Sequence, residues 1–264
     1  MPADLHSTPT PPLLEADEPA PFEVIEDERR SPFLITCDHA GKRLPRALGT
    51  LGLPESELNR HIAWDLGAAA VTRLLARELG AFAILQTYSR LVIDCNRPLE
   101  VPSSIPVISE HTVIPGNQNL SEAQRAERAR AIFHPYHDRI LSEFERRAQA
   151  AQPSVLIAMH SFTPTFKGVA RSWHTGMLYN RDVRLAHALI GLLRQDPELV
   201  VGDNEPYFVS DLSDYGVVVY GEGRGIAHVE IEIRQDLLEG EAGQAEWAER
   251  FARLLPEACA GLVS

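Results

Sequence analysis

The stretch PSVLIAMHS, at residues 153–161, decides the fold, because it is a continuous apolar run that ends in His160. The stretch SPFLITCDHAG, at residues 31–41, repeats the pattern with an apolar run that ends in Asp38 and His39. Short apolar runs without alternation are typical of strands that are buried on both faces, as in parallel sheets covered by helices. Both stretches therefore predict central strands of an α/β sheet.

Outward from these two strands, helical and strand patterns alternate along the chain. Helices are predicted over residues 55–79, 121–149, 181–196 and 241–256, and further strands over residues 81–89, 90–98 and 225–238. Ser121 and Gln124 have the spacing of a capping box, and Pro135 predicts a break inside the longest helix. This alternation predicts a three-layer α/β/α sandwich on a largely parallel or mixed sheet.

Composition narrows the classes of function. With 264 residues, of which 44% are hydrophobic and 23% charged, the chain resembles an ordinary globular protein. The formal net charge of −12 argues against a nucleic-acid-binding protein. No apolar run approaches the ~20 residues that cross a bilayer, so no membrane partner is expected. Three distant cysteines and an N-terminus without a signal-peptide pattern favour a cytoplasmic location.

Residues 1–31 differ from the rest of the chain. They contain six prolines and eight acidic residues, but only two basic ones. This composition predicts a flexible acidic tail, although the apolar residues Phe22, Val24 and Ile25 would allow part of it to dock on the body. Residues 32–264 are expected to form a single α/β domain.

His39 and His160 each come directly after, or at the end of, a predicted central strand. If the two strands are parallel, both imidazoles emerge at the same edge of the sheet, where α/β proteins bind ligands. Two neutral histidines on rigid strand ends suit a divalent metal, zinc by preference, with Zn–N bonds of about 2.0–2.1 Å. The repeated pattern favours this interpretation over two histidines that merely cap their strands.

A catalytic metal site needs a third protein ligand and an open coordination position. His61 and Asp65 lie four residues apart in HIAWDLG, residues 61–67, and share one face of the predicted helix. Asp65 is the preferred third ligand, because a carboxylate also neutralises part of the charge of the cation. His61 remains the alternative.

The strand HVEIEIR, residues 228–234, alternates strictly. One face carries His228, Glu230, Glu232 and Arg234, and the apolar residues between them point to the other face. An exposed edge strand would show the same pattern. In the core of an α/β sheet, however, such a row faces a cleft, where a carboxylate can act as general base toward a metal-activated water.

The segment SRLVIDCNRP, residues 89–98, gathers Arg90, Asp94, Asn96 and Arg97. A guanidinium binds a carboxylate through two parallel hydrogen bonds and an amide adds a donor, so Asn96 and Arg97 suit a small-molecule carboxylate substrate. Asp94 would orient Arg97. The alternative is a turn held by salt bridges.

Two later loops are candidates to cover the site. TFKGVARSWHTG, residues 165–176, follows the His160 strand and contains Arg171, a further candidate for substrate binding. NEPY, residues 204–207, is a similar turn. The phosphate-binding patterns GxxxxGK[ST] and GxGxxG are absent, as is the nucleophile elbow GxSxG, which argues against nucleotide binding and against a serine hydrolase.

Taken in order, these motifs resemble the N-formylglutamate amidohydrolase family. The matching pieces are CDHAGKRLP (37–45), HIAWDLGA (61–68), YSRLVIDCNRP (88–98), FHPYH (133–137), MHSFTPTFKGVAR (159–171), VGDNEPY (201–207) and HVEIEIRQDL (228–237). Together they span about residues 32–238, most of the body of the chain, and the tail lies outside the resemblance.

The resemblance implies a phosphorylase/hydrolase-like α/β/α sandwich, similar to zinc exopeptidases. It implies hydrolysis of N-formyl-L-glutamate to L-glutamate and formate, the last step of one route of histidine degradation. It also implies roles for six residues: metal ligands His39 and His160, general base Glu232, substrate-carboxylate ligands Asn96 and Arg97, and Arg90 to polarise the scissile carbonyl.

The sequence departs from the family's pattern at three places. Lys42 stands where the related exopeptidases place a glutamate, so Asp65 is the expected third ligand. CDHAG and DCNRP replace PHSG or PHAG and DLNRP. The chain thus resembles a divergent branch, for which hydrolysis of a different N-acyl amino acid or small amide is an alternative to hydrolysis of N-formyl-L-glutamate. A metal-free small-molecule-binding protein on the same fold is the non-enzymatic alternative.

Overall fold

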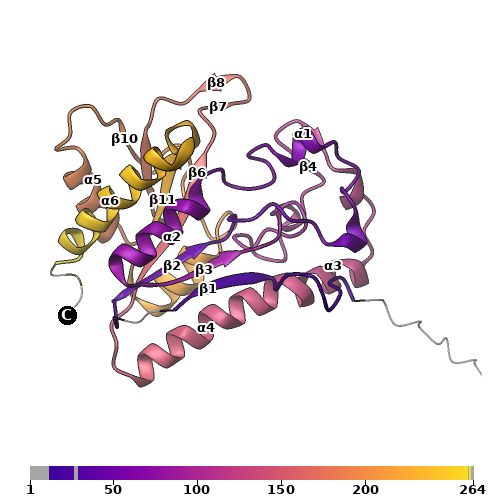
Figure 1. The fold of residues 1–264 in the computed structure, drawn as a ribbon, viewed down its shortest axis with the longest axis horizontal. Coiled ribbons are helices and arrows are strands. Elements are labelled where there is room, and N and C mark those ends of the chain that lie inside the picture. Colours follow the sequence, from indigo (N-terminus) through magenta and orange to yellow (C-terminus); the bar gives the residue numbers. More distant parts are fainter. Residues whose placement is uncertain (1–11, 27–28, 261, 263–264) are drawn as a thin grey trace, which may run out of the picture.

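The computed structural model describes residues 12–26, 29–260 and 262, and the first eleven residues of the expected tail lie outside this part. Within it, seven strands form one mixed sheet in the order β1-β3-β2-β6-β11-β9-β10 (Figure 1). Their bounds are β1 Phe22–Ile25, β2 Phe33–Cys37, β3 Phe82–Gln86, β6 Val155–Phe162, β9 Thr175–Leu178, β10 Val201–Asp203 and β11 Ala227–Arg234. The four central strands β3, β2, β6 and β11 are parallel, whereas β1 and β9 run antiparallel to their neighbours β3 and β11.

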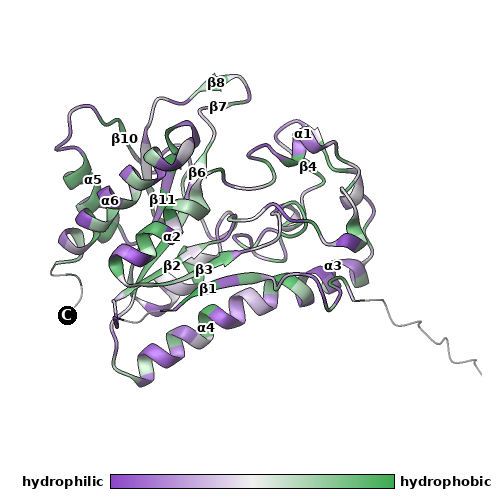
Figure 2. Ribbon diagram, viewed as in Figure 1, coloured by the Kyte–Doolittle hydropathy of each residue, from purple (hydrophilic) through white to green (hydrophobic). Residues whose placement is uncertain are grey.

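Helices cover both faces of this sheet, as the sequence predicts. One face carries α2 (Ala68–Leu79), α5 (Arg184–Leu193) and α6 (Gly240–Cys259), and the other carries α4 (His134–Gln149) (Figure 1). The three-layer α/β/α fold is confirmed. The helices are amphipathic, with hydrophobic residues toward the sheet and hydrophilic residues toward solvent (Figure 2).

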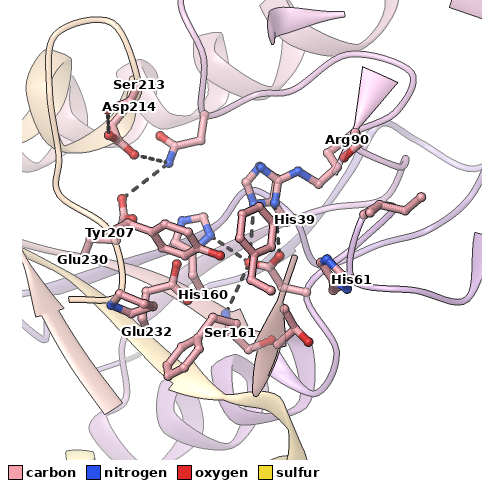
Figure 3. Close-up of a pocket in the computed structure, with 18 of the residues that line it drawn as sticks. His39, His61, Arg90, His160, Ser161, Tyr207, Ser213, Asp214, Glu230 and Glu232 are labelled. Atoms are coloured by element: carbon pink, nitrogen blue, oxygen red, sulfur yellow. Dashed lines mark hydrogen bonds and ion pairs between the residues drawn. The ribbon is translucent and has the colours of Figure 1, made fainter. Parts of the chain in front are cut away.

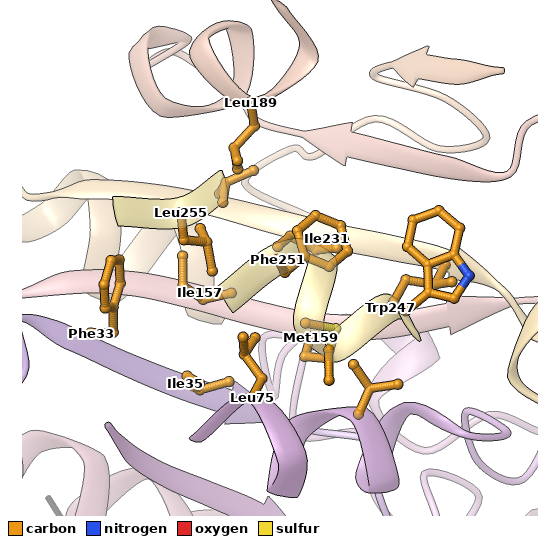
Figure 4. Close-up of a cluster of buried hydrophobic side chains, with 14 of the residues drawn as sticks. Phe33, Ile35, Leu75, Ile157, Met159, Leu189, Ile231, Trp247, Phe251 and Leu255 are labelled. Atoms are coloured by element: carbon orange, nitrogen blue, oxygen red, sulfur yellow. The ribbon is translucent and has the colours of Figure 1, made fainter. Parts of the chain in front are cut away.

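The core follows the two-residue period of the strands. Ile35, Ile157 and Ile231 pack on the first face against Leu75 and Phe251 of the helices (Figure 4). The next residues along the strands point the other way, toward α4. Because the central strands are buried on both faces, their side chains fix the register, and with it the positions of the polar residues that follow.

Shorter elements complete the chain around the C-terminal edge of the central strands. They are the helices α1 (Glu55–Leu58) and α3 (Glu122–Arg128), the hairpin of β4 (Ile108–Ser109) and β5 (Thr112–Val113), and the hairpin of β7 (Thr165–Phe166) and β8 (Val169–Ala170). The capping box of Ser121 and Gln124 is present at the start of α3. The break expected near Pro135 is a π-helical segment, Ala129–Phe133, between α3 and α4.

The continuous helix expected over residues 55–79 is wrong. Residues 59–67 form turns between α1 and α2. The backbone N–H of Asp65 donates to the carbonyl of His39 at 2.9 Å, outside any helix, and Gly67 has a left-handed φ of 81°. A Cβ at Gly67 would lie 2.4 Å from Leu238 Cβ, so close packing as well as backbone conformation requires glycine here.

The strand expected over residues 90–98 is also wrong, because this segment is a series of turns. Its carbonyl groups bond to side chains instead of to a neighbouring strand. The carbonyl of Leu91 accepts a hydrogen bond from Asn117 Nδ2 at 2.8 Å, and that of Val92 accepts one from the buried Arg128 at 2.9 Å. The buried apolar side chains of this segment produced a strand-like pattern.

A flexible tail over all of residues 1–31 is contradicted at Phe22–Ile25, which form the edge strand β1. This strand pairs antiparallel with β3, with Phe22 opposite Gln86 and Ile25 opposite Ala83. Phe22 and Val24 pack toward the α4 side of the sheet. The apolar residues of this segment therefore outweigh its proline-rich and acidic composition.

Candidate active site

The two strand-end histidines meet at the C-terminal edge of the sheet, as expected from parallel strands. His39 follows β2, His160 lies in β6, and their ring centroids are 4.9 Å apart. Asp65, in the turn before α2, places Oδ2 3.4 Å from His39 Nδ1 and 2.9 Å from His160 Nδ1. All three side chains are buried, and each offers a ligand atom within 4.8 Å of the others. The geometry therefore fits a metal ion.

A carboxylate stands behind each imidazole. Asp94 Oδ1 lies 2.7 Å from His39 Nε2, and Asp38 Oδ2 lies 3.5 Å from His160 Nε2. The Nε2 atoms thus face carboxylates while both Nδ1 atoms face Asp65. Carboxylates in this position orient metal-binding histidines and increase their basicity. Among the described residues, His39 Nδ1 has no hydrogen-bond partner, a second observation that fits a metal ligand at this position.

Arg90 bridges two of these carboxylates. Its Nη1 lies 3.4 Å from Asp65 Oδ1, and its Nη2 donates to Asp94 Oδ2 at 3.0 Å. Burial alone would raise the pKa of Asp65 and of Asp94, but the adjacent His39 and Arg90 hold the pKa of Asp94 well below its usual range, and His39 and His160 do so for Asp65. Both carboxylates are therefore ionised at neutral pH. Asp94 orients His39 and Arg90, whereas the sequence suggested that it orients Arg97.

Glu230 and Glu232 of β11 line the same pocket (Figure 3). Glu232 is opposite His160 in the parallel register of β11 and β6. It is 5% exposed, and its Oε2 has no hydrogen-bond partner among the described residues. Burial raises the pKa of Glu232 well above its usual range, and it also raises the pKa of Glu230. An unpartnered, buried carboxyl group next to a candidate metal site is suited to proton transfer.

Of the row expected on β11, Glu230 and Glu232 reach the pocket, whereas His228 and Arg234 do not line it. His228 Nδ1 lies 2.8 Å from the carbonyl of Ile226, and Arg234 pairs with Asp236. The strand is central, which excludes the exposed-edge interpretation. The polar row therefore serves the pocket only at its middle two positions.

Asn96 fixes the chain at residues 214–216, which follow β10 in sequence. Its Oδ1 accepts hydrogen bonds from the backbone N–H groups of Tyr215 and Gly216, at 2.9 and 3.1 Å. Its Nδ2 donates to Asp214 at 3.2 Å and to Glu230 at 3.4 Å. The amide lines the pocket, but its donors and acceptor are already engaged by the protein.

Arg97 also lines the pocket, and its Nη1 donates to the carbonyls of Asn96 and Ser213. Asp214 lies 3.8 Å from the same nitrogen. No described residue accepts a hydrogen bond from Nε or Nη2 of Arg97. The free edge of the guanidinium is thus available to a ligand.

His61 and Arg171 differ from the sequence expectation in how they take part. His61 lines the pocket but is not among the three grouped ligand atoms, and its Nε2 lies 3.5 Å from Glu110 Oε2. Arg171 does not line the pocket. Its guanidinium lies between the rings of Phe166 and Tyr207, both of which do line it. Arg171 therefore contacts the pocket through these two rings, and not directly as the sequence suggested.

Together these residues enclose a cavity of about 460 Å³ at the C-terminal edge of the sheet. Sequence reasoning did not assign Asp38, Tyr207 or Asp214, which belong to this site. Asp38 carried a signal, because it directly precedes His39 at the strand end. Asp214 carried none, since its segment has no periodic pattern and is held at the pocket by Asn96 and Arg97, which are distant in sequence.

The fold and this site define an α/β protein with a polar pocket at the C-terminal ends of its central strands, where proteins of this class bind their ligands. The family model for N-formylglutamate amidohydrolase matches residues 31–239, and the chain therefore belongs to this family of amide hydrolases.

Solved structures share this fold. The crystal structure of a gene product of Agrobacterium tumefaciens has a TM-score of 0.91 and 37% sequence identity, with 94% of this chain and 98% of that chain covered. N-formylglutamate amidohydrolase from Ralstonia eutropha has a TM-score of 0.66 and 20% identity, with 90% and 97% covered, which supports the shared fold. No curated protein matches the chain. Among the described residues, no helix has the length and apolar character needed to cross a membrane.

Proposed function

We propose that the protein hydrolyses the amide bond of an N-formyl amino acid with the help of a divalent metal, and that N-formyl-L-glutamate, giving L-glutamate and formate, is its substrate. The observation that carries this proposal is the buried group of His39, Asp65 and His160 beside the unpartnered Glu232. As such an enzyme it would act in the last step of one route of histidine degradation.

His39, Asp65 and His160 would hold the metal, through the two Nδ1 atoms and a carboxylate oxygen. Two imidazoles and one carboxylate form a ligand set that suits zinc and leaves a position open. When bound, the metal supplies Lewis-acid polarisation of the amide carbonyl and lowers the pKa of a water to about 7. Asp94 and Asp38 keep the imidazoles in the required orientation.

Glu232 is the proposed general base and acid. Its free Oε2 takes the proton from the attacking water and then delivers it to the amine nitrogen of the leaving amino acid. Arg90 lines the pocket with its side chain 23% exposed. We assign its guanidinium to the oxygen of the scissile carbonyl, where negative charge develops during attack. Asp65 and Asp94 keep Arg90 fixed in this place.

The free edge of Arg97 is the proposed binding group for a substrate carboxylate. Asn96 supports this role by fixing Arg97 and the segment at Asp214, rather than by donating to the substrate. We expect Arg97→Ala to raise KM for N-formyl-L-glutamate by about 10- to 100-fold, because a hydrogen bond between two charged groups is lost. Steady-state kinetics check this, and an unchanged KM would remove Arg97 from substrate binding.

The charge of the pocket favours a second candidate, a different N-acyl amino acid. Arg90 is already paired with Asp65 and Asp94, so Arg97 is, among the described lining residues, the guanidinium with a free edge for a carboxylate. A single free guanidinium favours a substrate whose side chain is uncharged over a dianion. N-formyl-L-glutamine is such a substrate with nearly the same shape.

The deciding experiment compares chelator-treated protein with protein reloaded with Zn²⁺, on N-formyl-L-glutamate, N-formyl-L-glutamine and N-acetyl-L-glutamate. We expect hydrolysis of a formyl substrate only after reloading. Preference for the glutamine derivative would support the second candidate. Binding of these compounds without turnover in either form would instead indicate a binding protein, and full activity without metal would exclude the proposed metal dependence.

A further inference from the structure

The segment from Asn204 to Asp214 contains the NEPY motif, to which the proposed function gives no role. Its start is fixed to the sheet. The backbone N–H of Asn204 donates to the carbonyl of Met177, and Asn204 Oδ1 accepts from the N–H of Tyr179 at 2.9 Å. A Cβ at Gly176 would lie 1.8 Å from the carbonyl oxygen of Glu205, so the chain passes directly over β9 here. Tyr207 is thus presented from a well-anchored turn.

Tyr207 lines the pocket with 39% of its surface exposed, and it is labelled in Figure 3. Arg171 lies behind it. The guanidinium carbon of Arg171 is 4.6 Å from the ring centre of Tyr207 and 4.6 Å from that of Phe166. Its Nη1 donates a hydrogen bond to the Tyr207 hydroxyl at 2.7 Å. The same Nη1 lies 3.5 Å from the carbonyl oxygen of Thr163, so the contact with Tyr207 is the shorter of its two hydrogen bonds, and no described acidic side chain forms an ion pair with Arg171.

The direction of this hydrogen bond determines what the hydroxyl can do next. A guanidinium has no acceptor, so the Tyr207 oxygen must accept, and its own proton remains to be donated. No described residue accepts that proton. Burial and the nearby Glu232 raise the pKa of Tyr207, which therefore keeps its proton at neutral pH.

We propose that Tyr207 is a further catalytic residue, whose hydroxyl donates a hydrogen bond to the oxygen of the amide carbonyl under attack, and that Arg171 is its positioning residue. This inference rests on the proposed function. In this proposal, Tyr207 and Arg90 both donate hydrogen bonds to the same carbonyl oxygen. Tyr207 comes from the turn after β10, and Arg90 comes from the segment after β3. A donor held in place before the reaction stabilises the developing charge without reorganisation.

The first test is Tyr207→Phe, which removes the hydroxyl and keeps the ring that packs on Arg171. We expect kcat on the best formyl substrate to fall about 100-fold, with KM and bound zinc unchanged. Tyr179→Phe is the matched control, because its hydroxyl bonds to Asp203 outside the pocket, and we expect it to retain full activity. An unchanged kcat in Tyr207→Phe, or a loss confined to KM, would overturn the inference.

The second test separates the role of Arg171 from simple structural support. We expect Arg171→Ala to lower kcat about 10-fold in the wild-type background but to have no further effect in Tyr207→Phe, because both changes remove one function. Arg171→Lys should recover part of the loss, since an ammonium can also donate to the hydroxyl. Additive effects would contradict the positioning role.

The two proposals can fail separately. Wild-type protein that is inactive on every substrate would overturn the proposed function and this inference together. An active wild-type protein with an unaffected Tyr207→Phe variant would overturn only the inference.

Discussion

The two ends of the central strands bury charged side chains in different ways. At the N-terminal end of β2, Arg147 of α4 is fully buried. Its Nε donates to Glu143 Oε1 at 2.8 Å, and its other nitrogens donate to the carbonyls of Ser31 and Phe33 at 2.9 and 3.1 Å. This arginine is paired in charge and in hydrogen bonds.

At the C-terminal end, the charged groups are buried as deeply but are not all paired. His39 Nδ1 and Glu232 Oε2 have no hydrogen-bond partner among the described residues, and both belong to residues that line the cavity. A buried polar atom without a partner costs about 1–3 kcal/mol. The difference teaches that burial of charge alone does not mark the site. The site is marked by unpaired atoms of residues that also line the cavity, where a ligand would complete the network, whereas the unpaired atoms of His137 and His228 lie away from it.

The largest effect is expected from His160→Ala, which removes one of the proposed metal ligands at the C-terminal end of the strands. Without this ligand, we expect bound zinc to be lost and amide hydrolysis to fall about 10⁴-fold or more, because metal polarisation supplies several kcal/mol. Elemental analysis and turnover, with thermal melting as a check on folding, measure this. The exposed His187→Ala is the control. A folded His160→Ala enzyme with full activity would contradict the metal role.

Glu232→Gln should have the next largest effect. The amide has nearly the same shape but cannot accept the proton, so we expect turnover to fall about 10³-fold while bound zinc is retained. Glu230→Gln is the matched control on the same strand, two residues away, and should lose far less activity. Equal losses in the two variants would show that Glu232 has no special role.

Arg147→Met tests the N-terminal end of the strands, where the buried charges are paired. It leaves Glu143 buried, with Arg139 and Arg146 as remaining partners. We expect a loss of about 3 kcal/mol in the free energy of unfolding, with kcat/KM of the folded protein unchanged. Urea unfolding measures the loss, and the half-exposed Arg146→Met should cost about 1 kcal/mol or less. A loss of activity without loss of stability would contradict the structural role of this end.

The smallest effect concerns His137, a buried residue of α4 that belongs to neither end. Its Nδ1 lies 2.6 Å from the Tyr220 hydroxyl, and burial lowers its pKa from 6.5 to about 4, against the opposing pull of Asp38. The unfolded chain therefore binds more protons between these values, and stability falls as the pH is lowered from 6.5 toward 4, by at most about 1.4 kcal/mol per pH unit. His137→Gln should flatten this slope in urea unfolding measured at pH 5 and pH 7. An unchanged slope would assign the pH dependence to other groups.

Much of the fold follows from the sequence because strand and helix patterns are local. The apolar runs at Phe33–Cys37 and Val155–Met159 predict buried strands, and parallel pairing then brings His39 and His160 together. Helix spacing predicts Asp65 near the histidines for the wrong reason, because Asp65 lies in turns and α2 begins only after Gly67. The carboxylate reaches the histidines because its own backbone bonds to His39.

The remainder could not be predicted, because it depends on tertiary contacts. The turns at residues 90–98 exist because Asn117 and Arg128, distant in sequence, take up their carbonyl groups. Tyr207 enters the pocket through its contact with Arg171, a pairing that no local pattern encodes.

The central claim is that His39, Asp65 and His160 hold one metal ion on which amide hydrolysis depends. The most direct measurement is a titration of chelator-treated protein with Zn²⁺, in which bound metal and hydrolysis of the best formyl substrate are recorded together. The account predicts that activity rises in proportion to bound zinc and stops rising at one equivalent per chain. Activity that is complete before zinc is added, or zinc that binds at one equivalent without restoring hydrolysis, would contradict it.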